Sequence, residues 1–216
     1  MDPDKLPVPG TEALVRSPRL ARVPGVVHGF SRAVDDRGRR LDLGTHAKPA
    51  DWTWAASAVG LPRAPVARLR QVHGAVCRTV VKGGVAGDGD ALVTHTRGVL
   101  LAVRTADCVP VLIAGNGVVV AIHAGWRGLV ANVIAQTLAG LRGAGPWVAA
   151  VGPCIGVARY EVSEEVVDAL AGTGVNRDRF VVRPKAGRPH ADLREVARAQ
   201  LSDAGVADIE VLPHCT

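Results

Sequence analysis

Short apolar runs separated by polar or glycine-containing links dominate the middle of the chain. Residues 99–104, 109–114 and 118–122 are three such runs, each of a length typical of a buried strand. Asn116-Gly117 separates the second run from the third, and Asn-Gly is the strongest short-range hairpin signal. We expect the three runs to form an antiparallel meander, because parallel pairing needs a longer crossover than these links provide.

This meander predicts which polar residues meet. If the first strand runs up, the second returns and the third runs up again. The link that contains Asp107 and Cys108 and the turn that starts at His123 then lie at the same edge of the sheet. We therefore expect a carboxylate, a thiol and an imidazole to converge, although Cys108 and His123 are 15 residues apart.

Helical spacing follows the third run and recurs toward the C-terminus. Apolar residues over 126–141 repeat every three or four positions, which predicts one helix that packs on the sheet. Further helices are expected over 51–59, over 163–171 with Ser163 as its cap, and over 192–204. In the last helix, Asp192 and Glu195 form a capping-box pattern.

The remaining apolar runs read as strands. They cover residues 26–30, 66–72, 75–81, 91–94, 147–151, 180–182 and 209–212. Glycine-rich 82–89 is expected to be a loop. The pattern predicts an α/β (α+β) fold, in which a β-sheet with an antiparallel meander is flanked by helices. Residues 1–25, rich in proline and arginine, are expected to form an extended N-terminal segment before a single domain over 26–216.

Composition narrows the classes of function. The 216 residues are 48% hydrophobic, so a folded globule is expected. The net charge of +6 comes from scattered arginines, without the basic and aromatic interleaving of nucleic-acid binders, so no nucleic-acid partner is expected. No leader-like start and no apolar stretch of membrane-spanning length is present, which predicts a cytoplasmic protein without a membrane partner. The four cysteines lack CxxC spacing and are expected to be reduced.

The candidate chemistry centres on His73, Cys108 and His123. Imidazole nitrogen and thiolate sulfur suit Zn²⁺, and catalytic zinc sites typically combine three protein ligands with one open position. Zinc there would lower the pKa of bound water toward 7. Two alternatives remain open: Cys108 and His123 could form a nucleophile–base dyad, or Cys108 could be a buried thiol with two unrelated histidines.

Residues beside this cluster suggest an anion site. Gly125, Trp126, Arg127 and Gly128 open the predicted helix, where free backbone N–H groups favour anions and Arg127 can add a charge-assisted hydrogen bond. Alternatively, the glycines only permit the turn and Arg127 is solvated. Asp107 is a candidate general base or ligand-orienting residue, although a surface acid needs no function.

Six motifs in order carry a resemblance to a known family. They are QVHG (71–74), DGDALVT (88–94), TADCVPVL (105–112), HAGWRG (123–128), GPCIG with YEV (152–162), and DL, QL, G and CT within 192–216. Together they resemble the bacterial YfiH-type family, whose members have been described as polyphenol oxidase laccases and as purine nucleoside phosphorylases with adenosine deaminase activity.

The resemblance implies a single α/β domain of mixed sheet with flanking helices, related to a fold also used by cysteine hydrolases. It also implies a zinc site on His73, Cys108 and His123. It implies phosphorolysis of adenosine, inosine and methylthioadenosine, with hydrolytic loss of the adenine amino group. Asp107, Cys108 and Arg127 would then be catalytic, and the helix start at Gly125 would hold phosphate. A purine nucleoside and phosphate are the expected partners, with the protein a monomer or homodimer.

Other functions remain open within this resemblance. One is a copper-dependent (Cu²⁺) polyphenol oxidase, although the chain has only seven histidines and no HxH pair. Another is a peptidoglycan-precursor editing amidohydrolase that uses Cys108. A third is a zinc-binding member deficient in turnover, since Asp51-Trp52 stands where the family usually carries Asn-Arg, and the chain ends at Thr216, before an aromatic, Arg-rich stretch usual in the family.

Overall fold

A six-stranded mixed β-sheet forms the centre of the protein in a computed structural model, which describes residues 14–34, 43–44, 46–141 and 145–216. The strand order is β13-β10-β8-β9-β6-β4. The inner pairs β10/β8, β8/β9 and β9/β6 are antiparallel, and the outer pairs β13/β10 and β6/β4 are parallel. The strands are β4 (Cys77–Thr79), β6 (Ala91–Thr94), β8 (Val109–Gly115), β9 (Val118–Ala124), β10 (Val148–Val151) and β13 (Asp208–Val211). The predicted mixed sheet is confirmed.

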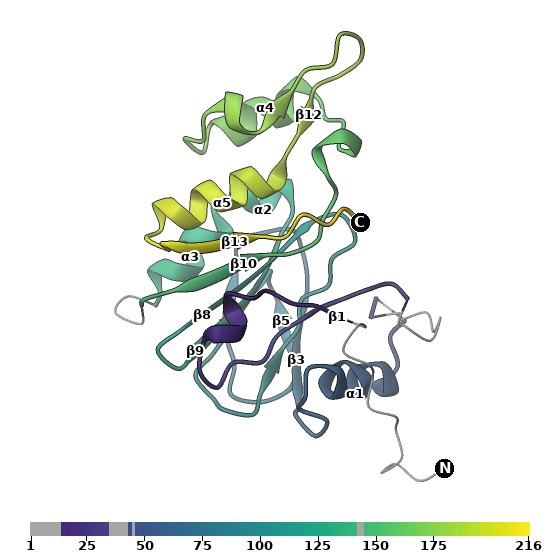
Figure 1. The fold of residues 1–216 in the computed structure, drawn as a ribbon, viewed down its shortest axis with the longest axis vertical. Helices are drawn as coiled ribbons and strands as arrows, with labels where there is room; N and C mark the ends of the chain where they lie inside the picture. Colours follow the sequence, from purple (N-terminus) through teal and green to yellow (C-terminus); the bar gives the residue numbers. More distant parts are fainter. Residues whose placement is uncertain (1–13, 35–42, 45, 142–144) are drawn as a thin grey trace.

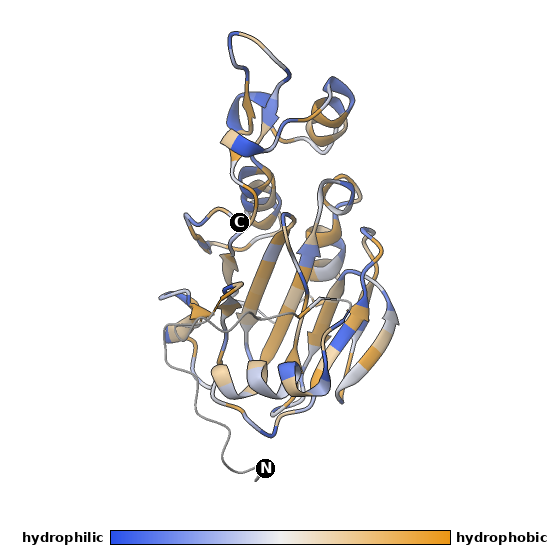
Figure 2. Ribbon diagram, turned by 90° about the vertical axis from the view of Figure 1, so that its right-hand side faces the viewer, coloured by the Kyte–Doolittle hydropathy of each residue, from blue (hydrophilic) through white to orange (hydrophobic). Residues whose placement is uncertain are grey.

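Helices cover one face of this sheet (Figure 1). They are α2 (Trp126–Val130), α3 (Val133–Ala139) and α5 (Leu193–Asp203), while α4 (Glu164–Ala171) lies further out and packs on α2. Aliphatic side chains of β8, β9 and β10 pack against them and are almost fully buried, as are Val111 and Ile122 on the strands and Leu129 and Val196 on the helices. Figure 2 shows this apolar character along the central strands. With so few aromatic residues, aliphatic burial supplies most of the hydrophobic driving force.

The opposite face is covered partly by the N-terminal region. β1 (Leu14–Val15) pairs with β2 (Phe30–Ser31), and the 3-10 helix η3 (Leu20–Arg22) lies between them in sequence. Leu20 and Phe30 pack on the sheet. The expected strand over 26–30 is thus reduced to two residues that begin at Phe30. The expected extended segment contains this 3-10 turn, and its first 13 residues lie outside the described residues.

A smaller sheet corrects two expectations. β3 (Val66–Arg70) lies between β5 (Gly84–Asp88) and β7 (Leu100–Leu101), both parallel to it. The run 99–104 is therefore not the first strand of a meander, because its backbone pairs with β3: the Ala102 N–H donates to the Ala67 carbonyl. The glycine-rich stretch expected to be a loop contains β5. The helix expected over 51–59 is present as α1 (Pro49–Ala58).

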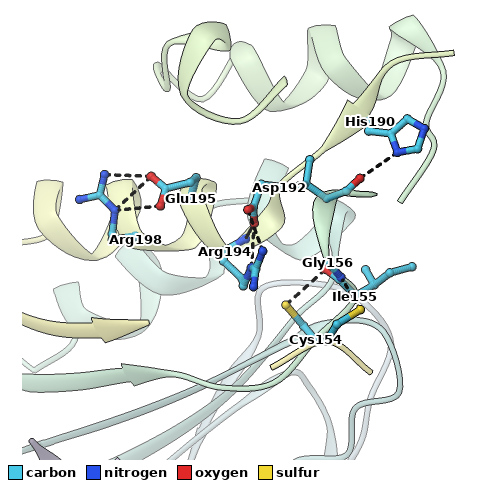
Figure 3. Close-up of polar contacts among 10 residues, drawn as sticks. Cys154, Ile155, Gly156, His190, Asp192, Arg194, Glu195 and Arg198 are labelled. Carbon is cyan, nitrogen blue, oxygen red and sulfur yellow. Dashed lines mark hydrogen bonds and ion pairs between the residues drawn. The ribbon is translucent and has the colours of Figure 1, made fainter. Parts of the chain in front are cut away.

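The helix expected over 126–141 is broken into α2 and α3. Asn132 between them has a φ of 55°, in the left-handed region that asparagine tolerates better than most residues. At α5, the Asp192 carboxylate accepts the backbone N–H of Arg194, as predicted for a cap (Figure 3). Glu195 pairs with Arg198 and does not complete a capping box, and Ser163 makes no side-chain cap at α4.

The remaining elements are peripheral. β11 (Val181–Val182) and β12 (His190–Ala191) form a short antiparallel pair, and η4 (Val157–Arg159) and η5 (Arg177–Arg179) are single 3-10 turns. All four cysteines are free, as expected. Within the described ranges, no helix combines the length and apolarity needed to cross a bilayer.

Candidate metal centre

One rim of the six-stranded sheet gathers the polar residues. β6 and β8 begin at this rim and β9 ends there, because β9 is antiparallel to both. Cys108 immediately precedes β8, and His123 near the end of β9 pairs with Pro110. The predicted convergence of Cys108 and His123 is therefore confirmed. The β8–β9 hairpin alone brings these two residues together, and the strand expected over 99–104 takes no part.

His73 reaches the same rim from the loop between β3 and β4. Its φ of 58° lies in the left-handed region, which is uncommon for a residue with a side chain. The Asp90 carboxylate accepts the backbone N–H groups of Val72, His73 and Gly74 at 3.3, 3.0 and 2.7 Å, and these bonds stabilise the unusual turn. A buried acid thus brings His73 to the site, 35 residues before Cys108 in the sequence.

The three predicted residues form one cluster. The ligand atoms of His73, Cys108 and His123 all lie within 4.8 Å of one another. The two imidazole rings meet edge to face at a centroid distance of 4.8 Å. His123 is buried, Cys108 is half-buried and His73 is exposed, so the cluster is open on one side. Two nitrogens and one sulfur in this arrangement could hold a divalent ion with an open coordination position.

Asp90 fixes the orientation of His123. The His123 Nδ1 atom lies 2.8 Å from Asp90 Oδ1, and the Asp90 side chain is fully buried. An ionised carboxylate only accepts hydrogen bonds, so Nδ1 carries the proton and the Nε2 lone pair is free to bind a metal. A carboxylate behind a histidine ligand is a recurrent feature of metal sites. The sequence analysis did not identify this role, although Asp90 directly precedes a predicted strand.

The electrostatics favour a neutral imidazole. Burial lowers the pKa of His123, and electrostatic interactions with His73 and Arg104 also lower it, while the hydrogen bond that His123 donates to Asp90 and the charge of that carboxylate oppose the shift. Burial raises the pKa of the Cys108 thiol, and the carboxylates of Asp107 and Asp90 raise it further. Without a cation nearby, Cys108 therefore remains protonated, unlike the activated cysteine that a nucleophile–base dyad requires.

A side-chain amide ties together the two loops that carry His73 and Cys108. Gln71 Nε2–H donates to the Arg104 carbonyl at 2.7 Å, and Gln71 Oε1 accepts the Arg104 backbone N–H at 2.8 Å. These two bonds resemble a hydrogen-bonded residue pair of a β-sheet, and they join residues that lie 33 positions apart in the sequence. It fixes the distance between the loops on which the cluster depends. Its role could not be predicted without knowing that these loops are neighbours.

Glycine at position 125 leaves space for the cluster. A Cβ atom there would lie 3.0 Å from Cys108 Sγ and 3.2 Å from His73 Cδ2, closer than ordinary packing allows. The helix start at Gly125 is therefore adjacent to the cluster, as predicted. α2 has only five residues, so its dipole contributes little to anion binding.

Arg127 and Trp126 lie at this helix start as a stacked pair. The Arg127 guanidinium carbon is 4.5 Å from the centroid of the Trp126 ring, and Arg127 is exposed. Gly128 is buried, and a Cβ atom there would lie only 3.1 Å from the Gly74 carbonyl oxygen, so glycine lets the helix pack closely on the His73 loop. The expected role of these residues in phosphate binding stays a prediction.

Two further polar side chains border the cluster. Asp107 is exposed, its carbonyl accepts the Ile155 N–H at 3.0 Å, and its carboxylate accepts a hydrogen bond from Thr216 at 3.4 Å. Tyr160 is half-buried; burial raises its pKa, as do the charges of Cys108 and Asp107, while Arg127 lowers it.

Cys154 lies outside the cluster. Its side chain is fully buried, and burial raises its pKa to about 12. This agrees with a packed thiol in place of a ligand.

Comparisons with known proteins agree with these features. The family described as multi-copper polyphenol oxidoreductase laccase matches residues 46–216. A purine nucleoside phosphorylase of Deinococcus radiodurans is 43% identical over 169 residues, which cover 74% of this chain and 64% of that protein. Adenosine deaminase RL5, from an unknown prokaryotic organism, is 40% identical over 136 residues, 59% of this chain and 52% of that protein. The chain thus spans less than two thirds of the length of both relatives.

A solved structure shares the fold. YlmD from Geobacillus stearothermophilus matches with a TM-score of 0.79 and 28% identity. The match covers 94% of this chain and 86% of that chain. The arrangement of sheet and helices is therefore the one found in that protein.

Proposed function

This chain belongs to the multi-copper polyphenol oxidoreductase laccase family, and we propose that it is a zinc-dependent purine nucleoside phosphorylase with adenosine deaminase activity. Adenosine, inosine and methylthioadenosine are the proposed nucleoside substrates, with phosphate as the second substrate. The similarity to proteins named for these two activities supports the substrate class. The observation that carries the proposal is the His73–Cys108–His123 cluster, open on one side and backed by a buried carboxylate.

The donor set fits zinc. One thiolate and two neutral imidazoles are typical zinc ligands, and the Asp90–His123 hydrogen bond occupies Nδ1 and leaves Nε2 free to bind a metal. Zinc bound there would act as a Lewis acid and lower the pKa of a water molecule toward 7. The proton of the Cys108 thiol would be lost on binding, because a metal binds the thiolate.

The surrounding residues have proposed roles in handling charge and protons. Arg127, exposed beside the helix start, would hold the phosphate that attacks the ribose carbon as the purine base leaves. Gly125, Trp126 and Gly128 would line this phosphate site through backbone N–H groups. Asp107 would move a proton to or from the purine, since its carboxylate is exposed next to Cys108.

A second function, copper-dependent polyphenol oxidation, is favoured by the family's description and by the donor set. Two histidines and one cysteine also bind copper in electron-transfer sites, where a weak axial ligand completes the coordination. The peptidoglycan-editing alternative requires Cys108 as a nucleophile. Its raised pKa works against that chemistry unless a cation stabilises the thiolate.

Metal content and product analysis test the proposal together. Protein purified without added metal should contain one zinc per chain, and His73→Ala and Cys108→Ser should lose most of it. His95→Ala, which changes an exposed histidine outside the cluster, should keep the zinc. Zinc-loaded protein should convert adenosine and phosphate to adenine and ribose 1-phosphate, with inosine and hypoxanthine from deamination.

The alternatives predict different results in the same experiments. Copper in the purified protein and oxygen uptake with a phenol would support the polyphenol oxidase. Bound zinc without any purine product would identify a member deficient in turnover and would refute the proposed enzyme.

A further inference from the structure

Two cysteines outside the metal cluster lie side by side on neighbouring stretches of backbone. Cys154 follows β10, Cys215 follows β13, and the two pair as an isolated parallel β-bridge. The Thr216 N–H donates to the Cys154 carbonyl at 3.1 Å as one bond of this bridge. Neighbouring strands lie about 4.8 Å apart. This spacing falls within the range of about 4.4–6.8 Å that separates the Cα atoms of disulfide-bonded cysteines.

The sulfur of Cys215 is held against the loop that contains Cys154. The Gly156 N–H, two residues after Cys154, donates to Cys215 Sγ at 3.2 Å (Figure 3). A Cβ atom at Gly156 would lie 3.3 Å from the same sulfur, so glycine at this position leaves room for it. Two thiols from distant parts of the sequence therefore meet in one small region of the fold.

The backbone around Cys215 can make the short approach that a disulfide requires. The Cβ atoms of a disulfide lie about 3.5–4.5 Å apart, slightly less than the strand spacing. β13 ends at Val211, and Cys215 pairs with Cys154 in an isolated bridge and not within a ladder. Residues 213–216 are exposed, so little packing opposes a small movement of this segment.

The surroundings of the two thiols set the order in which they react. Cys154 is fully buried; burial raises its pKa to about 12, and the charge of the nearby Arg194 guanidinium opposes the shift. A protonated, buried thiol is a poor nucleophile toward a molecule in solution. Cys215 is exposed, so an oxidant reaches its sulfur first. Cys154 then reacts within the protein, where proximity offsets its low reactivity.

We propose that Cys154 and Cys215 form a reversible disulfide when a low-molecular-weight disulfide, such as glutathione disulfide, oxidises the protein. The Cys215 thiolate attacks one sulfur of glutathione disulfide and releases one glutathione, which takes up the proton that Cys215 lost. The Cys154 thiol loses its proton as its sulfur attacks the Cys215 sulfur, and the second glutathione leaves with that proton. Two protein thiols are oxidised, and one glutathione disulfide is reduced to two thiols.

The disulfide would close beside the metal centre without using a residue of the cluster. The residue after each cysteine bonds to Asp107: the Ile155 N–H donates to its carbonyl at 3.0 Å, and the Thr216 hydroxyl donates to its carboxylate at 3.4 Å. Asp107 directly precedes Cys108, so the new bond would tie together the two segments that hold this link. The exchange requires neither zinc nor a purine, so the proposal succeeds or fails separately from the proposed function.

Peptide mapping tests the pairing directly, because trypsin places the four cysteines on four different peptides. The protein is incubated with glutathione disulfide, the remaining thiols are blocked with N-ethylmaleimide, and the digest is analysed by mass spectrometry without reduction. We expect a linked pair of peptides that contains Cys154 and Cys215 and that separates after dithiothreitol. The linked pair should form both in zinc-loaded and in metal-free protein.

Single substitutions test the order of the two attacks. Cys154→Ser should stop at a mixed disulfide between Cys215 and glutathione, because the second thiol is missing. If Cys154→Ser does not fold, Cys154→Ala keeps the site apolar and should give the same mixed disulfide. Cys215→Ser changes an exposed residue and should leave Cys154 unmodified.

The other two cysteines provide matched controls. Cys77→Ser changes a half-buried thiol on β4, at the opposite edge of the sheet from β13, and should still form the linked pair. Cys108→Ser should form it too, because the metal-cluster thiol takes no part in the exchange.

Urea denaturation gives a second readout. The oxidised protein should unfold at a higher urea concentration than the reduced protein, because the cross-link restricts the unfolded chain. Cys215→Ser should unfold at the same concentration under both conditions. The proposal is overturned if the folded protein yields no linked pair of Cys154 and Cys215, or if the pair forms only after urea has unfolded the chain. It is also overturned if Cys215 pairs with Cys108 instead.

Discussion

The Nδ1 atom of His123 lies 2.8 Å from the Oδ1 atom of Asp90, although 33 residues separate them in the sequence. The same buried carboxylate accepts the backbone N–H of His73 at 3.0 Å. One acid therefore orients the ring of one histidine and the backbone of the other. If these histidines bind a metal, Asp90 determines how well they are placed before the ion arrives.

Asp90→Asn is expected to reduce zinc affinity about 10- to 100-fold, the usual effect of removing a carboxylate behind a metal-binding histidine. Asparagine can accept through only one oxygen, and its NH₂ group would face the N–H groups of the His73 loop. Competition with a chromophoric chelator measures the affinity. Asp88→Asn is the matched control, because Asp88 is exposed and pairs with Arg70. Equal zinc affinity in both variants would contradict this role of Asp90.

Gly125→Ala is expected to lower zinc affinity about tenfold while the protein stays folded. The new Cβ would press on Cys108 Sγ and His73 Cδ2, and such overpacking typically costs ~1–3 kcal/mol. The φ of −74° at Gly125 suits alanine, so the effect comes from contact and not from backbone strain. Gly140→Ala is the control: its φ is −73°, and its Cβ would meet only the Thr137 carbonyl, at 3.6 Å. Unchanged zinc binding by Gly125→Ala would show that the cluster adapts.

Gln71→Leu is expected to destabilise the fold by about 1 kcal/mol and to weaken zinc binding further than stability alone explains. Leucine leaves the Arg104 N–H and carbonyl without their partner, and the half-buried position lets water compensate partly. Urea denaturation of metal-free protein gives the first quantity, and chelator competition gives the second. Gln136→Leu is a suitable comparison, since Gln136 makes one exposed hydrogen bond far from the rim. A loss of stability with normal zinc affinity would mean that the two Gln71–Arg104 hydrogen bonds have only a structural role.

His28 is expected to make the fold less stable as pH falls below about 6.5. Burial lowers the pKa of His28, the Arg16 charge lowers it further, and the Glu210 carboxylate opposes both. His28 Nε2 accepts the backbone N–H of Ser17 at 2.8 Å, which a protonated ring cannot do. The unfolded chain therefore binds a proton before the folded protein does. The contribution to stability is complete above the ordinary histidine pKa and is lost progressively below it.

Urea denaturation at several pH values between 5 and 8 measures this dependence. His28→Gln retains an acceptor near the Nε2 position but does not titrate, so its stability should fall less steeply with pH than that of the wild type. His95→Gln removes an exposed histidine and should follow the wild-type curve. Parallel curves for wild type and His28→Gln would refute the assignment.

Local patterns in the sequence determined the hairpin and most of the helices. Asn116-Gly117 favours a tight turn, and pairing of the flanking apolar runs follows from it, so Cys108 and His123 had to meet at one rim. The Asp192 cap likewise depends only on residues within one turn of α5. These features involve contacts between near neighbours, whose geometry the backbone and the side-chain period largely specify.

Tertiary structure alone decided the rest. The apolar character of the run 99–104 suits pairing with β8 as well as with β3, so its composition could not predict the partner. In the structure it pairs with β3. The helical spacing of apolar residues continues on both sides of Asn132, so this spacing did not predict that the helix would break there. His73 joins the cluster only because Asp90, just before β6, holds its loop. Each of these outcomes depends on contacts between residues far apart in the chain, and a one-dimensional pattern does not specify which distant partners meet.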